Sequence, residues 1–314
     1  MILIVTNQDD LTADYLITHL QSRGLRYYRL NSDEIHTAQV TIELGGESNR
    51  RSIRSGPKVV ELSEITSAWY RRSVSPTAPD FVSLSARRFV VGELQHLAEG
   101  MILGGDVRWV NSISATRMAE RKLFQLNVAN AVGLKTPKTL VTNDANAVAS
   151  FFRSGCGEVI TKPIYHGYWA KSGGDRAAYT RELGKAGLPS QEQLDACPCL
   201  IQTRIQKGSD IRLTLVGCHA FAVRIRTPPG SLVDWRHPEV DTRYEECTIP
   251  TEVMSACRRL MDRLGLVYGA IDLIQARDGD WYFLEVNPAG EWAWLERQLK
   301  LPISDALINL LTQG

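Results

Sequence analysis

The chain has 314 residues, of which 44% are hydrophobic and 23% charged, and its formal net charge is +1 at pH 7. This length and composition allow a sizeable core in two or three lobes, and the near-zero charge argues against bulk binding of nucleic acid or an acidic membrane surface. No segment approaches the roughly 18 apolar residues of a membrane span, no signal peptide precedes the first strand, and the six cysteines show no C-x-x-C pair, so we expect a reduced, cytoplasmic protein.

The first third of the chain alternates predicted strands and helices. A buried strand at 2–5 is followed by an amphipathic helix over 10–23, which ends at Gly24, and by a returning strand at 27–30. Further short strands are predicted at 39–44, 52–53, 59–62 and 65–70, with a helix over 87–103. Because no G-x-G-x-x-G pattern follows the first strand, a dinucleotide site is disfavoured and this lobe is predicted to be a doubly wound scaffold.

Two arginines, Arg71 and Arg72, follow the aromatic pair Trp69-Tyr70 at the end of a predicted strand. Guanidinium groups at this position could hold an anion or an acidic peptide side chain through charge-assisted hydrogen bonds. A solvated basic tip is the alternative.

Two lysines in the middle of the chain lie in predicted helix or strand elements, and the second of them, Lys162, is a candidate for binding phosphate. Lys122 lies in a helix predicted over 116–131, capped by residues 111–115 and ended by Gly133. Lys162 ends an apolar strand, where a buried ammonium group needs an anionic partner such as a triphosphate. The Gly-rich loop 165–174 could fold its amides over phosphates, but the absence of a Walker A pattern disfavours a P-loop enzyme.

The next predicted strands carry charged residues in alternation. Asp210 and Arg212 share one face of a strand at 209–217, with a surface ion pair as the alternative interpretation. Arg224 and Arg226 likewise share a face of the following strand. Asp234-Trp-Arg236 comes after a Pro-Gly break.

A predicted hairpin near the C-terminus carries three oxygen ligands. Its strands at 267–274 and 281–286 are joined by an Asp-Gly turn. Glu285 and Asn287 are two residues apart and share a face, and the hairpin can lay Asp272 beside them. Asp272 would be costly to bury without a partner. Two carboxylates and an amide suit Mg²⁺, which is usually completed by water and substrate phosphates.

This hairpin resembles the ATP-grasp superfamily, in which an acid in an apolar strand precedes an E-V/I-N-P sequence by ten to fifteen residues. Trp69-Tyr-Arg-Arg72, Asp234-Trp-Arg236 and the segment 287–296 narrow the resemblance to the graspetide maturases of the microviridin type. These ligases close ester or amide rings between side chains of ribosomal precursor peptides. Asp210-Ile-Arg212 resembles the ribosomal-protein glutamate ligases. Two positions depart from the pattern: Arg224 stands where an acid is frequent, and Glu291 where glutamine is usual.

The resemblance implies an α/β ATP-grasp fold of three lobes, namely a pre-ATP-grasp domain at 1–114, a central lobe at 115–200 and a C-terminal lobe at 201–314. It implies two Mg²⁺ ions held by Asp272, Glu285 and Asn287, and catalytic roles for Lys162, Arg212 and Arg236. The ATP-binding residues it implies are Lys122, Lys162, Gln202, Thr203, Arg204, Ile205, Asp210 and Arg236. Acidic substrate side chains would be held by Arg71, Arg72, Arg224 and Arg226.

The resemblance also implies what the protein does. ATP would activate Asp or Glu side chains of a precursor peptide as acyl phosphates, which Ser, Thr or Lys side chains then capture. We expect the peptide to carry a leader and an acidic core, and the enzyme to be a homodimer that binds neither nucleic acid nor membrane. Two alternatives stay open: a ligase of the same fold that adds amino acids to a protein terminus or to another amino acid, and a non-catalytic peptide-binding relative.

Overall fold

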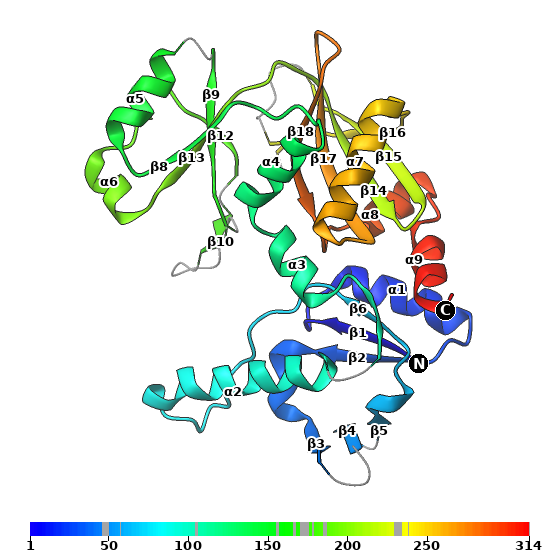
Figure 1. Cartoon of the computed structure of the whole chain (residues 1–314). Coiled ribbons are helices and arrows are strands. Elements are labelled where there is room, and N and C mark those ends of the chain that lie inside the picture. Colours follow the sequence, from blue (N-terminus) through cyan, green and yellow to red (C-terminus); the bar gives the residue numbers. More distant parts are fainter. Residues whose placement is uncertain are drawn as a thin grey trace.

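The computed structural model describes residues 1–45, 50–56, 58–103, 106–154, 157–165, 168–169, 176–177, 179–184, 187–228, 234–237 and 239–313. Within these ranges three groups of strands follow one another along the chain, each with its own helices (Figure 1). Most of the predicted Gly-rich loop 165–174 lies outside the described residues. No helix of the described part is long and apolar enough to cross a bilayer.

The N-terminal lobe is built on a parallel sheet with strand order β2-β1-β6-β7. The strand β1 is buried along its whole length, as expected of a central parallel strand covered on both faces. Helix α1 packs on one face and helix α2 on the other. The elements are β1 (Ile2–Thr6), α1 (Leu11–Ser22), β2 (Tyr27–Asn31), β6 (Ser67–Tyr70), α2 (Leu84–Leu103) and β7 (Arg108–Val110).

A smaller antiparallel sheet completes this lobe below the parallel one (Figure 1). Its strands are β3 (Gln39–Glu43), β4 (Arg50–Ser55) and β5 (Lys58–Glu61), and two 3₁₀ turns, η1 (Ser32–Thr37) and η2 (Leu62–Glu64), flank them. The doubly wound lobe expected from the sequence is therefore present, with a longer α2 than predicted.

The helix predicted over 116–131 is in fact two helices, α3 (Ile113–Ala119) and α4 (Lys122–Ala131). Ser112 caps α3 by accepting a hydrogen bond from the amide of Ala115 at 3.2 Å. The chain turns at Glu120 and Arg121, and the carbonyl of Ala119 accepts a hydrogen bond from the Gln125 side chain. Lys122 is consequently the first residue of α4 and lies next to the turn between the two helices.

The central lobe is an antiparallel sheet with strand order β12-β9-β13-β8, packed on one face by two helices. A two-stranded ribbon, β10 (Tyr168–Trp169) and β11 (Arg176–Ala177), lies below it. The elements of the lobe are β8 (Thr139–Thr142), α5 (Ala145–Arg153), β9 (Val159–Lys162), β12 (Arg181–Glu182), α6 (Gln191–Ala196) and β13 (Cys199–Thr203).

The C-terminal lobe is a five-stranded antiparallel sheet with strand order β16-β15-β14-β17-β18. Helices α7 and α4 cover one face, around Leu213, Ile271 and Phe283. The other face is apolar at one end, where α8 and α9 cover it, and polar at the opposite end. The elements are β14 (Lys207–Val216), β15 (His219–Arg226), β16 (Arg243–Glu246), α7 (Thr251–Leu264), β17 (Tyr268–Ala276), β18 (Trp281–Asn287), α8 (Ala293–Leu299) and α9 (Ile303–Thr312).

One hydrophobic core joins the N-terminal and C-terminal lobes. Trp69 and Val110 of the parallel sheet pack in the same cluster as Val223 and Tyr268 of the C-terminal sheet, with Leu307 of α9 among them. These side chains are fully buried. The polar end of the C-terminal sheet is therefore held at a constant distance from the N-terminal lobe.

Candidate nucleotide and metal site

The hairpin of β17 and β18 places the two predicted carboxylates side by side. Asp272 pairs with Glu285, and Ala270 pairs with Asn287. The register shifts by one residue between Asp272 and Leu273, so Leu284 is an extra residue in β18. Without this bulge Asp272 would face Leu284, because paired residues of antiparallel strands share a face. The bulge thus brings both carboxylates to the polar end of one face.

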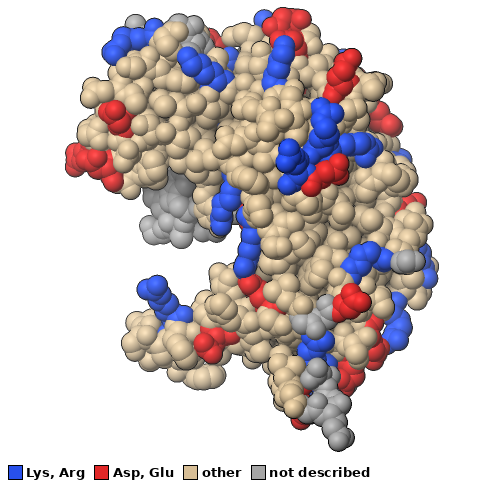
Figure 2. All heavy atoms as spheres, viewed as in Figure 1, with Lys and Arg blue, Asp and Glu red and all other residues tan. Residues whose placement is uncertain are grey.

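Cations from three separate elements converge on these carboxylates. Arg212 of β14 donates from Nη1 to Asp272 Oδ1 at 2.8 Å. Arg236 donates from Nη1 to Glu285 Oε1 at 3.2 Å. The Lys122 ammonium, at the start of α4, lies 3.7 Å from Glu285 Oε2. Space-filling Figure 2 shows a hollow between the central and N-terminal lobes, and Lys and Arg side chains gather on its inner wall.

The charged side chains at the site shift one another's pKa values. Burial raises the pKa of Glu285, but Arg236, Lys162 and Lys122 outweigh burial and bring it down to about 2. Burial also lowers the pKa of Lys162, and Glu285 opposes this change. Glu285 is therefore an anion at neutral pH, and an added anion would raise the pKa of Lys162 by favouring its charged form.

Arg236 is fixed by the aspartate that precedes it in the Asp-Trp-Arg motif. Its Nε donates to Asp234 Oδ1 at 2.9 Å and its Nη2 to Asp234 Oδ2 at 3.2 Å, a bidentate pair. Asp234 is buried, and the guanidinium group is about half exposed. The pair holds the guanidinium over Glu285 while leaving part of it accessible. Trp235 packs on Trp294 with ring centroids 5.8 Å apart.

The donor set fits Mg²⁺ together with phosphate groups. Two carboxylates and the exposed amide of Asn287 supply oxygen ligands, which is fewer than a full protein cage and matches the preference of Mg²⁺ for substrate phosphates. Among the described residues no cluster of three or more His, Cys, Asp and Glu side chains forms, so a closed all-protein metal cage is not found there. Lys122, Lys162, Arg212 and Arg236 would meet the phosphates.

The predicted adenine hinge lies at the end of β13. Its amides at Thr203 and Arg204 donate to the carbonyls of Lys138 and Glu158 at 3.0 and 2.7 Å. The Arg204 side chain pairs with Glu158 and Glu182, and Gln202 is buried and donates to Thr139. The Arg204 side chain is therefore already paired within the central lobe. The prediction that this segment binds adenine then rests on Ile205 and the backbone carbonyls.

Asp210 and Arg212 share the site face, as alternation predicted. Asp210 accepts a hydrogen bond from Lys207 at 2.7 Å. Burial raises its pKa and Lys207 lowers it, with burial the larger effect. The role of Asp210 on a ribose stays a prediction.

Three of the four predicted substrate arginines already have carboxylate partners in the structure. Arg224 and Arg226 pair with Glu245, and register places them with Ile211 on the opposite face of the sheet from Asp272. Arg71 is buried and pairs with Asp10. The substrate role of these three stays a prediction, and alternation shows which residues share a face but not which face they share. Arg72 is about half exposed.

Two amide side chains that the sequence did not single out support the hairpin. Gln125 of α4 is buried, accepts from the amide of Val286 at 2.9 Å and donates to its carbonyl at 2.9 Å. Asn111, after β7, accepts from the amides of Val267 and Tyr268 at 2.8 and 2.9 Å. Each pins a strand of the hairpin through its backbone. Neither residue belongs to a sequence motif, so their supporting role becomes apparent only from their buried positions in the fold.

Comparisons with known proteins agree with this geometry. A model of the MvdD pre-ATP-grasp domain matches residues 1–117. The chain is similar in structure to the macrocyclase MdnC from Microcystis aeruginosa MRC, solved with its precursor peptide MdnA, with a TM-score of 0.89, 29% identity and 99% of each chain covered. It shares its fold with a RiPP-associated ATP-grasp ligase from Chryseobacterium gregarium, at a TM-score of 0.89 and 24% identity over 99% of this chain and 96% of that one.

Two curated relatives are tetrahydromethanopterin:alpha-L-glutamate ligases. The one from Methanocaldococcus jannaschii is 34% identical over 71 residues, and the one from Methanococcus maripaludis is 24% identical over 182 residues. The matches span 23% and 55% of this chain, and only 24% and 58% of those enzymes. The match of its N-terminal domain and the similarity in structure over 99% of its length show that the chain has an ATP-grasp fold, and the hairpin of paired carboxylates agrees with this fold.

Proposed function

We propose that the chain is an ATP-dependent ligase that links side chains of a ribosomal precursor peptide. One observation carries the proposal: Lys122, Lys162, Arg212 and Arg236, from separate elements, converge on the carboxylate pair of the β17–β18 hairpin. Four basic side chains around two carboxylates suit a metal-bound triphosphate. The similarity to MdnC, which was solved with its precursor peptide, supports a peptide as the substrate.

The chemistry proposed for this site has two steps. An oxygen of an Asp or Glu side chain of the peptide bonds to the γ-phosphorus of ATP, and the bond to ADP breaks. A Ser or Thr hydroxyl or a Lys amine then bonds to the acyl carbon, phosphate leaves, and the nucleophile's proton passes to solvent. The product has lost one water for each linkage. No nucleophile on the protein is required.

The residues have distinct tasks in these steps. Arg212, Arg236 and Lys162 neutralise charge that grows on the transferred phosphoryl group, and Lys122 binds the phosphates. Asp272, Glu285 and Asn287 would hold Mg²⁺, which supplies Lewis-acid neutralisation of phosphate oxygens when bound. Because Asp234 fixes Arg236 through two hydrogen bonds, its guanidinium is preorganised for this task.

The finer parts of the proposal are two Mg²⁺ ions, ATP held at 202–205 and by Asp210, a leader segment on an acidic precursor, a homodimer in the cytoplasm, and domains at 1–114, 115–200 and 201–314. A second candidate function is the addition of free amino acids to a peptide or protein terminus. The matches to two glutamate ligases favour it.

Mass spectrometry separates the two functions. The chain is incubated with ATP, Mg²⁺ and an acidic precursor peptide encoded beside its gene, and ADP is measured in parallel. Loss of one water per linkage, abolished in Asp272→Asn, is the expected result. A mass gain equal to an amino-acid residue, seen when free glutamate is added, would establish the second function. ADP formation without any change of peptide mass would overturn both.

A further inference from the structure

The segment 287–291, which starts at the last residue of β18 and leads toward α8, is held by the N-terminal lobe. Asn111 donates from Nδ2 to the carbonyl of Pro288 at 3.1 Å while its Oδ1 binds β17. The loop begins with Asn287, a predicted metal ligand, and ends with Glu291, where the sequence departs from the family pattern. The N-terminal lobe is therefore in direct contact with the segment that borders the site.

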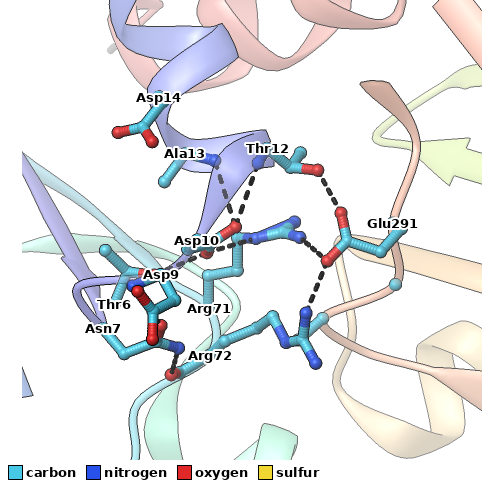
Figure 3. A network of polar contacts seen from close by, with 12 residues as sticks. Thr6, Asn7, Asp9, Asp10, Thr12, Ala13, Asp14, Arg71, Arg72 and Glu291 are labelled. Atoms are coloured by element: carbon cyan, nitrogen blue, oxygen red, sulfur yellow. Dashed lines mark hydrogen bonds and ion pairs between the residues drawn. The ribbon is translucent and has the colours of Figure 1, made fainter. Parts of the chain in front are cut away.

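Glu291 joins the two lobes through a network of charges (Figure 3). Its Oε1 lies 2.7 Å from Arg71 Nη2 and accepts a hydrogen bond from Arg72 Nη1 at 2.7 Å. Its Oε2 accepts a hydrogen bond from the hydroxyl of Thr12, at the start of α1. Arg71 in turn donates from Nε to Asp10 at 2.7 Å. We call Asp10, Thr12, Arg71, Arg72 and Glu291 the interlobe clamp.

The clamp is built around buried charge. The side chains of Asp10 and Arg71 are wholly inaccessible, and Asp10 also caps α1 by accepting from the amides of Thr12 and Ala13. A buried guanidinium group is stable only when its charge is compensated. Arg71 meets one carboxylate from its own lobe and one from the C-terminal lobe, so separating the lobes removes half of its compensation.

Hydrogen bonds connect the interlobe clamp to the polar end of the C-terminal sheet. Arg212 donates from Nη2 to the carbonyl of Glu291 at 3.3 Å and from Nη1 to Asp272 at 2.8 Å. Tyr268 donates to the carbonyl of Gly290 at 2.6 Å. The loop is packed so closely that a Cβ on Gly290 would lie 2.4 Å from the Cβ of Ala270. A shift of Glu291 would therefore displace Arg212 and the loop that carries Asn287.

We propose that Glu291 is a positioning residue, which couples docking of the N-terminal lobe to the placement of Arg212 and Asn287. Its side chain binds residues of the N-terminal lobe. Its backbone carbonyl accepts a hydrogen bond from Arg212 and so orients this arginine toward Asp272. The effect on catalysis rests on the proposed function, whereas the mechanical coupling does not. The N-terminal lobe thus supports the site in addition to serving as a scaffold.

The test compares Glu291→Ala and Glu291→Gln with Asp305→Asn, a matched control that breaks the exposed interlobe pair with Arg23. Hydrogen exchange of the amides of Ala289 and Gly290, which donate within the loop at 2.9 and 3.2 Å, reports its order without any nucleotide. We expect exchange to accelerate about tenfold in Glu291→Ala, less in the isosteric Gln variant and not in the control. The Mg²⁺ concentration for half-maximal ADP formation should rise about tenfold in Glu291→Ala, as for other supports of metal ligands.

Unchanged loop exchange in folded Glu291→Ala, or an unchanged Mg²⁺ requirement in an active enzyme, would overturn the proposal. A loss of thermal stability alone, with both readouts at their wild-type values, would also overturn it. Should Glu291→Ala fail to fold, Glu291→Gln and Arg72→Ala, which removes the exposed cation of the clamp, carry the same test. If the wild-type chain forms no ADP, the exchange experiment still decides the coupling, and only the proposed function fails.

Discussion

Replacing Glu285 with glutamine should make stability at neutral pH lower and less sensitive to acid. The carboxyl has a pKa of about 2 in the folded chain and 4.5 ordinarily, because Arg236, Lys162 and Lys122 overcome the effect of burial. A depressed pKa contributes stability that is present above pH 4.5 and lost as the pH falls toward 2. At 1.36 kcal/mol per pH unit, the fall corresponds to about 3 kcal/mol. Glutamine lacks this contribution at every pH.

The assay is urea denaturation, followed by tryptophan fluorescence at several pH values between 7 and 2.5. Wild type should exceed Glu285→Gln by about 3 kcal/mol at pH 7, and the difference should narrow steadily below pH 4.5. Glu61→Gln, which removes an exposed partner of Arg50, serves as control and should change stability by about 1 kcal/mol or less. A wild-type advantage that stays constant from pH 7 to pH 2.5 would refute the reasoning, since a group without a depressed pKa gives no such slope.

Three further changes test other parts of the structure. Arg236→Ala should lower kcat for ADP formation by roughly two to three powers of ten with a smaller effect on the KM for ATP, and an effect on KM alone would contradict its role in phosphoryl transfer. Asn111→Ala should lower the free energy of unfolding by about 3 kcal/mol or more in urea titrations, because it removes the hydrogen-bond partner of two backbone amides and two carbonyls, most of them buried. A loss below about 1 kcal/mol would contradict this. Gly290→Ala should destabilise by about 1–3 kcal/mol in the same assay, because its Cβ would overlap Ala270, and wild-type stability would show that the loop yields freely.

Local patterns predicted the hairpin well. Period-2 alternation together with an Asp-Gly turn predicted its two strands, and the buried strand end of Lys162 indicated an anionic neighbour. The bulge at Leu284, which brings Asp272 opposite Glu285, was not predicted. The break between α3 and α4 was missed, because it contains neither glycine nor proline and is stabilised by Gln125 from the following helix. Gln125 is itself held by the backbone of Val286 in β18, a tertiary contact that the local sequence does not reveal.

Long-range pairings were beyond the reach of the sequence. Arg71 and Glu291 are 220 residues apart, and only the docked lobes reveal that the arginine already has two carboxylate partners. The same limit applies to Arg224, whose face depends on the register of β15 against β14. Motifs thus predicted residues for the chemistry of the site, whereas the contacts that support the site became visible only in three dimensions.

The single-residue bulge at Leu284 has a consequence for changes in chain length. Residues added at the tip between Arg277 and Asp280 leave the pairing of Asp272 with Glu285 untouched, so peptide tags or reporter loops can be inserted there. Deleting Leu284 would instead remove the bulge at unchanged turn length and restore regular alternation. Glu285 would then occupy the place of Leu284 opposite Asp272 and keep the carboxylate pair, while the ladder on the turn side would stay paired. The hairpin therefore has one position where residues can be inserted and one where a residue can be deleted. Neither change alters the pairing of Asp272 with Glu285.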